Sequence, residues 1–120
     1  FIEAGLERAC FTGAGLRMSD FSAAKLAGSR FDQALLEQCL FPRADARLSQ
    51  WQRARCRRCD FSRARLDHAD FSQAILEHCN LHAIGEQETR WGACRFESVQ
   101  RTDPVLLRAE EWQYEDRQAR

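Results

Sequence analysis

A five-residue period runs through the first two-thirds of the chain and restricts what this chain can fold into. Every fifth residue from Phe1 to Leu81 is apolar: of these 17 residues, 15 are Phe, Leu or Trp, and the other two are Ala46 and Cys56. The residues two positions before them, from Ala4 to Cys79, are all Ala, Ser or Cys. Such regular columns of large and small side chains indicate a structural repeat.

The period excludes the ordinary secondary structures. On an α-helix five residues advance about 500°, so the large side chains would drift around the helix instead of sharing a face. On a straight strand an odd step sends successive large residues to opposite faces. A chain that turns a corner every five residues keeps both columns inside. Four such sides predict a square coil of about 20 residues, with neighbouring coils about 4.8 Å apart.

Residues twenty positions apart support this coil and point to a known family. Phe1, Phe21, Phe41, Phe61 and Leu81 form one predicted stack, and Phe11, Phe31, Trp51 and Phe71 form the stack on the opposite side. Units such as Ala69-Asp70-Phe71-Ser72-Gln73 and Cys59-Asp60-Phe61-Ser62-Arg63 resemble the pentapeptide-repeat family. The resemblance implies an all-β solenoid, a right-handed quadrilateral β-helix, here of about 4–5 coils with a C-terminal capping α-helix. It implies little about activity, because the motif encodes the interior.

The sequence divides into three expected segments. Residues 1–81 form the repeats, and we expect an irregular final coil over 82–102, because Glu86 takes a large inward position next to Gly85. Residues 103–120 are expected to form a helix and tail, with Asp103 as N-cap and Pro104 at the first helical position. A solenoid end is open, so the helix is expected to cap it.

One face of this helix suggests an alternative role. Val105, Ala109 and Trp112 share a face, with Leu106 beside it. The alternative to a cap is therefore a homodimer or partner contact through Trp112.

The cysteines are interpreted as interior residues. Cys56 and Cys59 form a C-x-x-C motif, but Cys56 fills a large inward position and Cys59 a small one. A zinc site needs four convergent ligands, and the sequence has no second such motif. Cys39, Cys59 and Cys79 are expected to form a ladder of reduced thiols. No metal and no cofactor is therefore expected.

Catalytic residues are not apparent either. His68, His78 and His82 all fall at outward positions, without a nucleophile and carboxylate arranged as a triad. No glycine-rich phosphate loop is visible. We therefore expect no enzyme activity and no small-molecule substrate.

The outward positions suggest a docking patch for a partner with an acidic surface. Arg17, Glu37, Arg57 and Glu77 recur at twenty-residue spacing with alternating charge, which is expected to support the coil register. Leu35, Leu40 and Ile75 add apolar spots beside a basic band around the third coil, made of Arg43, Arg47, Arg53, Arg55, Arg57, Arg58, Arg63 and Arg65. The alternative is an ordinary solvated surface. The candidate binding residues are Arg43, Arg53, Arg55, Arg57, Arg58, Leu35, Ile75 and Trp112.

Composition narrows the classes of partner and location. The chain has 18 basic and 18 acidic residues, which argues against a nucleic-acid binder. No run of about 18 apolar residues could span a membrane, and no signal peptide is visible. Reduced thiols suit the cytoplasm, or secretion from a bacterium by a system independent of signal peptides. Phe1 is already in phase, so we expect the repeats to belong to a larger protein.

Two functions remain open. The first is a non-catalytic protein-interaction or spacer module of a larger bacterial secretion-associated protein, because such segments resemble those of type VI and type III systems. The alternative is a DNA-mimicking protein that binds gyrase or topoisomerase, like the quinolone-resistance branch of the family. A DNA mimic requires a long acidic face. Residues 1–81 carry 12 basic and 10 acidic residues, which does not fit that requirement.

Overall fold

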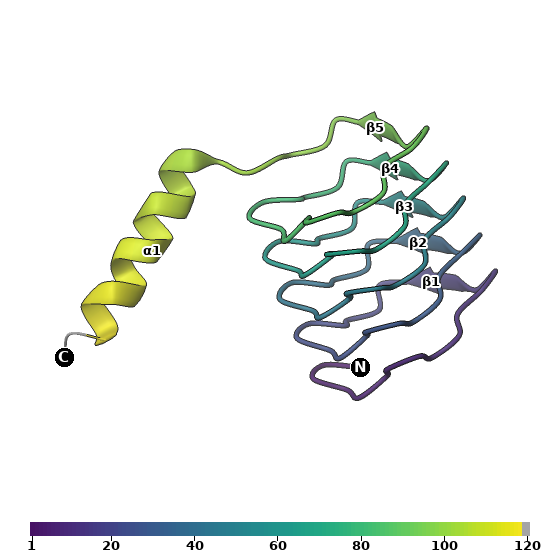
Figure 1. Cartoon of the computed structure of the whole chain (residues 1–120), viewed down its shortest axis with the longest axis horizontal. Helices are drawn as coiled ribbons and strands as arrows, with labels where there is room; N and C mark the ends of the chain where they lie inside the picture. Colours follow the sequence, from purple (N-terminus) through teal and green to yellow (C-terminus); the bar gives the residue numbers. More distant parts are fainter. Residues whose placement is uncertain (119–120) are drawn as a thin grey trace.

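The chain folds into a stack of parallel coils followed by one helix (Figure 1). The computed structural model describes the backbone of residues 1–118 and the side chains of residues 1–113. The five short strands form one parallel sheet in the order β1-β2-β3-β4-β5. The elements are β1 (Gly15–Arg17), β2 (Leu35–Glu37), β3 (Arg55–Arg57), β4 (Ile75–Glu77), β5 (Arg95–Glu97) and α1 (Pro104–Gln118).

The register confirms the twenty-residue coil. Leu16 pairs with Leu36, and Leu36 with Cys56, so every strand residue lies beside the residue twenty positions later. Isolated parallel bridges repeat this spacing on the other sides of the coil, for example between Leu40 and Asp60. The predicted fold, a quadrilateral β-solenoid with a C-terminal helix, is confirmed.

Each corner depends on a residue in the left-handed backbone region. Twenty residues spaced by five from Glu3 to Ser98 have φ between 52° and 72°, and only Gly13 and Gly28 among them are glycines. A hydrogen bond closes such a turn, from the N–H of the small inward residue to the carbonyl of the large residue three positions before it. For example, the N–H of Ala24 donates to the carbonyl of Phe21 at 3.0 Å. A turn with positive φ at its third residue reverses the chain sharply enough to point the large and small residues inward.

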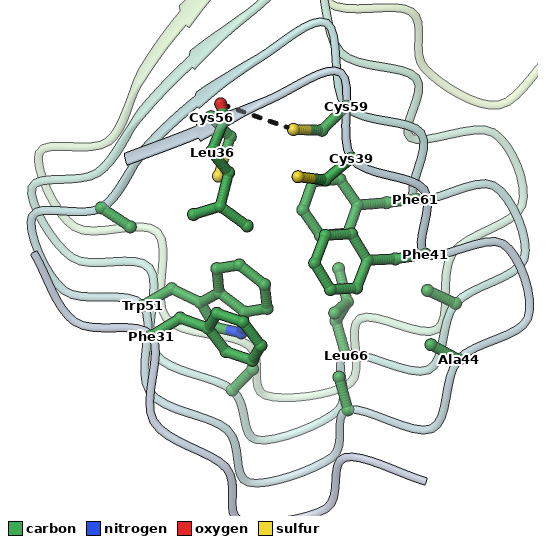
Figure 2. Close-up of a cluster of buried hydrophobic side chains, with 14 of the residues drawn as sticks. Phe31, Leu36, Cys39, Phe41, Ala44, Trp51, Cys56, Cys59, Phe61 and Leu66 are labelled. Atoms are coloured by element: carbon green, nitrogen blue, oxygen red, sulfur yellow. Dashed lines mark hydrogen bonds between the residues drawn. The ribbon is translucent and has the colours of Figure 1, made fainter. Parts of the chain in front are cut away.

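The aromatic columns fill the centre of the coils (Figure 2). Phe41 stacks face to face on Phe61 with ring centroids 5.0 Å apart, and Phe31 stacks on Trp51 at 4.2 Å. The two columns meet edge to face, as Phe41 meets Trp51 at 5.4 Å. Both arrangements are favourable for aromatic rings. The predicted columns are therefore the core of the solenoid.

The four cysteines assigned to inward positions, Cys39, Cys56, Cys59 and Cys79, lie inside, as predicted. Cys56 is fully buried, and Cys39 and Cys59 lie one above the other beside the aromatic stack (Figure 2). Their thiols act as weak donors to the backbone of the preceding coil: Cys59 donates to the carbonyl of Leu36 at 3.7 Å, and Cys79 to that of Cys56 at 3.3 Å. The column therefore links neighbouring coils as well as filling space.

The irregular conformation expected for residues 82–102 is wrong. β5 pairs with β4 in the same register, and the corner angles continue through Ser98. The inward Glu86 is tolerated because this is the last coil: its side chain remains exposed and pairs with Arg101 at 3.3 Å. Arg101 also lies over the rings of Trp91 and Phe96, 5.5 and 4.9 Å from their centroids. A single guanidinium therefore covers part of the open end.

The helix begins where the sequence predicts but does not cap the end of the solenoid. The carboxylate of Asp103 accepts hydrogen bonds from the N–H groups of Val105 and Leu106, at 3.0 and 3.2 Å. From there α1 runs back beside the coils (Figure 1). Phe96 in the last coil remains 39% exposed. Within the described residues, no helix has the length and apolar content needed to cross a bilayer.

Candidate docking surfaces

The stacked strands present two columns of outward side chains on one surface, which we call the strand face. Strand register places residues twenty apart in line, because each middle residue of a strand points inward and its neighbours point outward. The first column contains Gly15, Leu35, Arg55, Ile75 and Arg95, and the second contains Arg17, Glu37, Arg57, Glu77 and Glu97.

A shallow groove of about 510 Å³ crosses the strand face from β1 to β4. Leu35 lies in its wall with 59% of its surface exposed. Next to it the groove is lined by Gly15, where an added Cβ atom would lie in open space and meet no other atom within 4 Å. The groove therefore offers an apolar side chain beside a position without a side chain, and we call this open space the hollow at Gly15.

Charges on the strand face are mixed, and some are paired. Glu77 accepts from Arg55 at 3.4 Å and lies 4.0 Å from Arg57. Within the described residues neither Arg17 nor Glu37 forms an ion pair, so the predicted alternating column is paired only between the third and fourth coils. Exposed pairs of this kind contribute about 0–1 kcal/mol each. Their guanidinium groups can therefore exchange partners at little cost.

Two more predicted residues lie at the corners next to this face. Arg53 and Arg58 have φ of 60° and 54°, and both are exposed. Arg53 donates from Nε to the side-chain oxygen of Gln73 at 2.8 Å. The structure thus brings Leu35, Ile75 and four of the five predicted arginines to one region of the surface.

Arg43 does not belong to this group, which corrects the basic band expected from the sequence. Arg43 precedes Arg53 by ten residues, which is half of a four-sided coil, so the two point away from opposite corners. Arg43 instead lines a second groove, of about 520 Å³, which we call the side groove. Its floor is the side of the coils, and one wall is α1. The lining residues are Ile2, Glu3, Ser22, Ala23, Pro42, Arg43, Ser62, Arg63, Asn80, His82, Leu106 and Glu110.

Trp112 is also separate from the strand face. It lies on α1 with Val105 and Ala109, and Val105 and Trp112 are 79% and 68% exposed. The shared apolar face predicted for this helix therefore points away from the solenoid. The neighbouring face of the helix, with Leu106 and Glu110, borders the side groove.

A polar contact holds α1 against the coils. The carboxylate of Glu110 accepts from Nε of Arg63 at 2.6 Å and lies 2.8 Å from Nε2 of His82. On its other side, Nδ1 of His82 accepts from the backbone N–H of Asp103 at 3.1 Å. This second bond assigns the ring proton to Nε2, which donates to Glu110. His82 therefore contacts both the start and the second turn of α1.

The burial of His82 was not predicted. Its phase in the repeat places it outward, yet it is only 3% exposed, because the beginning of α1 covers it. No pattern within the repeats signals this, since the covering residues come from outside them. The contact has an electrostatic effect on α1: hydrogen bonding to His82, and then to Arg63, lowers the pKa of Glu110 below its ordinary value.

The two grooves expose arginine side chains and small apolar areas. Among the described residues, no group of three or more His, Cys, Asp or Glu side chains is arranged to hold a metal ion. His68 and His78 are exposed at corners, and His68 contacts only Glu88 among charged partners, at 3.3 Å. What the grooves offer is guanidinium groups beside small apolar areas.

Comparisons with known proteins agree with the repeat and the fold. The sequence matches the family described as Pentapeptide repeats over residues 19–50 and 52–83, as eight copies. A search of curated protein sequences finds no match. The structure is similar to the crystal structure of Rfr23, a pentapeptide repeat protein from the cyanobacterium Cyanothece 51142, with a TM-score of 0.76 and 18% identity over 79% of this chain.

Two other solved structures overlap less well. A pentapeptide repeat protein of the Arabidopsis thaliana thylakoid lumen, AT2G44920, gives a TM-score of 0.44 and 20% identity over 82% of this chain. QnrB1, a plasmid-mediated fluoroquinolone resistance protein, gives a TM-score of 0.27 and 12% identity, over 89% of this chain and 88% of that one. This chain spans 65% of the length of Rfr23 and 61% of that of AT2G44920.

At these identities the likeness to Rfr23 shows the fold alone. The family match covers more than half of the chain, and its repeats coincide with the observed coils. This chain belongs to the pentapeptide-repeat family.

Proposed function

We propose that this chain is a non-catalytic interaction module that binds another protein through the strand face. The observation that carries the proposal is Leu35, a large apolar side chain 59% exposed beside the hollow at Gly15. The interior explains every inward residue of the repeat, but it does not require a leucine at this outward position. Exposed apolar area surrounded by polar groups is typical of binding surfaces.

The chemistry of the groove suggests what the partner presents. An apolar side chain would enter the hollow at Gly15 and contact Leu35. Carboxylates around it would reach the guanidinium groups of Arg17, Arg53 and Arg58, which form no ion pair among the described residues. Arginine suits such contacts because its planar guanidinium binds carboxylates through two hydrogen bonds. The partner would therefore carry an apolar residue within an acidic surface.

We further propose that the module is part of a larger bacterial protein associated with a type VI-like secretion system. The support is the resemblance of the repeat segment to those of secretion-associated proteins. The test is to follow the full-length protein in its source organism, with and without the secretion apparatus. Release into the medium that depends on that apparatus supports the proposal, and retention in both strains opposes it.

The docking surface is tested by crosslinking and charge reversal. A photoreactive amino acid at Leu35 should crosslink one partner in source cells, and mass spectrometry would identify it. The Arg53→Glu, Arg55→Glu and Arg57→Glu triple variant should lose binding to that purified partner. A matched variant on other sides of the coil, with Arg8→Glu, Lys25→Glu and Arg65→Glu, should retain it. Equal losses in both variants would show that net charge, and not the strand face, is responsible.

The gyrase-binding alternative has less support. Mimicry of a duplex needs a regular array of negative charge, at about one charge per 1.7 Å of DNA axis. On the strand face, by contrast, Arg17, Arg55 and Arg57 lie next to Glu37 and Glu77, so the negative charges do not form a continuous array. The alternative predicts inhibition of gyrase supercoiling by the purified chain, and we expect no inhibition.

A further inference from the structure

The side groove shows in the molecule itself what kind of ligand it accepts. α1 places an apolar residue, Leu106, and a carboxylate, Glu110, one helical turn apart at the groove. The carboxylate is held by Arg63 and His82, which come from successive coils. The groove therefore recognises an acidic side chain presented by a helix that lies along the stack of coils.

The attachment of α1 to this groove is limited. Leu106 remains 44% exposed, and Val105 and Trp112 point into solvent. The side chains of Arg63 and Glu110 are themselves 30% and 29% exposed, so water reaches their ion pair. Such a contact can hold a tethered helix in place, because the tether supplies a high effective concentration. It does not bury enough apolar surface to make α1 a permanent part of the core.

The groove continues beyond the part that α1 uses. From Glu110 it extends past Ser62 and Pro42 to Ile2, which is 62% exposed, and to the carboxylate of Glu3 at the far end. Arg43 lies one coil before Arg63 in the same column, since its N–H donates to the carbonyl of Ser62 at 3.0 Å. In the part of the chain that the structure describes, Arg43 has no ion pair. One of two stacked arginines is thus engaged and the other is available.

The spacing of the two arginines fits a helix. Neighbouring coils are about 4.8 Å apart and one helical turn rises about 5.4 Å, so residues three or four apart on a helix face successive coils. A helix with two carboxylates one turn apart would therefore reach both Arg43 and Arg63. Among the described side chains of α1, Glu110 is the carboxylate that lines the groove.

We propose that the side groove binds an acidic amphipathic helix of a partner protein, which takes the place of α1. Its two carboxylates would pair with Arg43 and Arg63, and its apolar residues would pack on Ile2 and Pro42. In the absence of the partner, α1 occupies part of the site as an internal ligand. The inference shares the idea of an interaction module with the proposed function, but it concerns a different surface and can fail separately.

The test uses the full chain and a synthetic helical peptide as the probe. The peptide carries two glutamates one turn apart next to leucines, and its binding is measured by fluorescence anisotropy at low salt, where charge pairs are least screened. A peptide with glutamines in place of both glutamates serves as the ligand control. Circular dichroism of every variant checks that the solenoid remains folded.

Two substitutions should change the affinity in opposite directions. Glu110→Gln removes the internal competitor and should tighten binding by about three- to tenfold, since more of the protein is then in the open form. Arg43→Ser should weaken binding by about tenfold through loss of one charge-assisted pair. Arg8→Ser is the matched control, because Arg8 is an exposed arginine at an equivalent corner, with φ of 61° against 60° for Arg43. It should leave the affinity unchanged.

Four outcomes would overturn the inference. The first is an affinity that Glu110→Gln leaves unchanged, and the second is an equal loss with Arg8→Ser and Arg43→Ser. The third is a concentration-dependent dimer that Arg43→Ser abolishes, because the occupant would then be α1 of a second copy. The fourth is peptide binding that depends only on Arg55 and Arg57, which would exclude the side groove as the binding site and support the strand face.

Discussion

The hydroxyl of Ser49 accepts a hydrogen bond from the indole N–H of Trp51 at 2.7 Å and donates a hydrogen bond to the carbonyl of Ala46 at 2.5 Å. Both side chains are fully buried. One coil earlier Ser29 occupies the same inward column, but the residue two positions later is Phe31, which has no N–H to offer. Among the described residues, the hydroxyl of Ser29 has no hydrogen-bond partner. The same serine therefore has different roles in successive coils.

We expect Ser49→Ala to destabilise the solenoid by about 1–3 kcal/mol, because it leaves the buried indole N–H without an acceptor. Ser29→Ala should be neutral or stabilising, since it removes a buried hydroxyl that makes no hydrogen bond. Urea unfolding followed by tryptophan fluorescence measures both free energies of unfolding. Equal effects of the two substitutions would contradict the role assigned to Ser49.

The corner residues predict a second difference. Leu48 has φ of 62°, a region that a β-branched side chain rarely adopts, whereas Leu40 is an exposed leucine outside it. Leu48→Val should therefore cost about 1–2 kcal/mol more than Leu40→Val. Thermal unfolding of the two variants checks this. The corners would not be strained in the way described if both substitutions shifted Tm equally.

Thiol reactivity should follow burial and not pKa alone. A hydrogen bond with Thr12 lowers the pKa of the exposed Cys10, and hydrogen bonding from Cys59 lowers that of Cys39 to about 7. Cys39 is nevertheless fully buried, and burial raises the pKa of Cys94 to about 11. Iodoacetamide at neutral pH should therefore modify Cys10 first, as followed by mass spectrometry.

The control for this reaction is Cys10→Ser, which should remove the rapid adduct without exposing another. The inward cysteines should react only as fast as the chain unfolds. Modification of Cys39 at the rate of Cys10 in the folded protein would show that the core is open to the reagent.

Acid should release α1 from the coils. The pKa of Glu110 is lowered in the folded protein by His82 and Arg63, so this carboxylate stabilises docking at pH values above its ordinary pKa. That contribution is lost as the pH falls through the lowered pKa and the group becomes protonated. The protection factors of the amide hydrogens over residues 104–113, which correct for the slower intrinsic exchange in acid, should therefore fall as the pH falls. In the Glu110→Gln variant these protection factors should already be low at neutral pH. If they still fell with acid in this variant, a titrating group other than Glu110 would be responsible.

The sequence predicted the interior of this protein and several details of its end. The columns of Phe41 and Trp51, the inward Cys56 and Cys59, and the start of α1 after Asp103 could all be predicted. Each depends on a local rule repeated every five residues, or on capping within one turn. The same phase also separates Arg43 from Arg53, because ten residues are half a coil. The predicted basic band did not take this spacing into account and wrongly grouped the two arginines.

The placement of α1 depended on contacts that no repeat encodes. Its apolar face turned outward because Glu110 reaches Arg63 and His82 across the coils, residues 47 and 28 positions away in sequence. The open end was covered instead by Arg101, whose guanidinium lies over Phe96. Periodicity along a chain decides which side chains point inward. Which outward side chains then meet depends on distances between coils and helix, and only the folded molecule sets those.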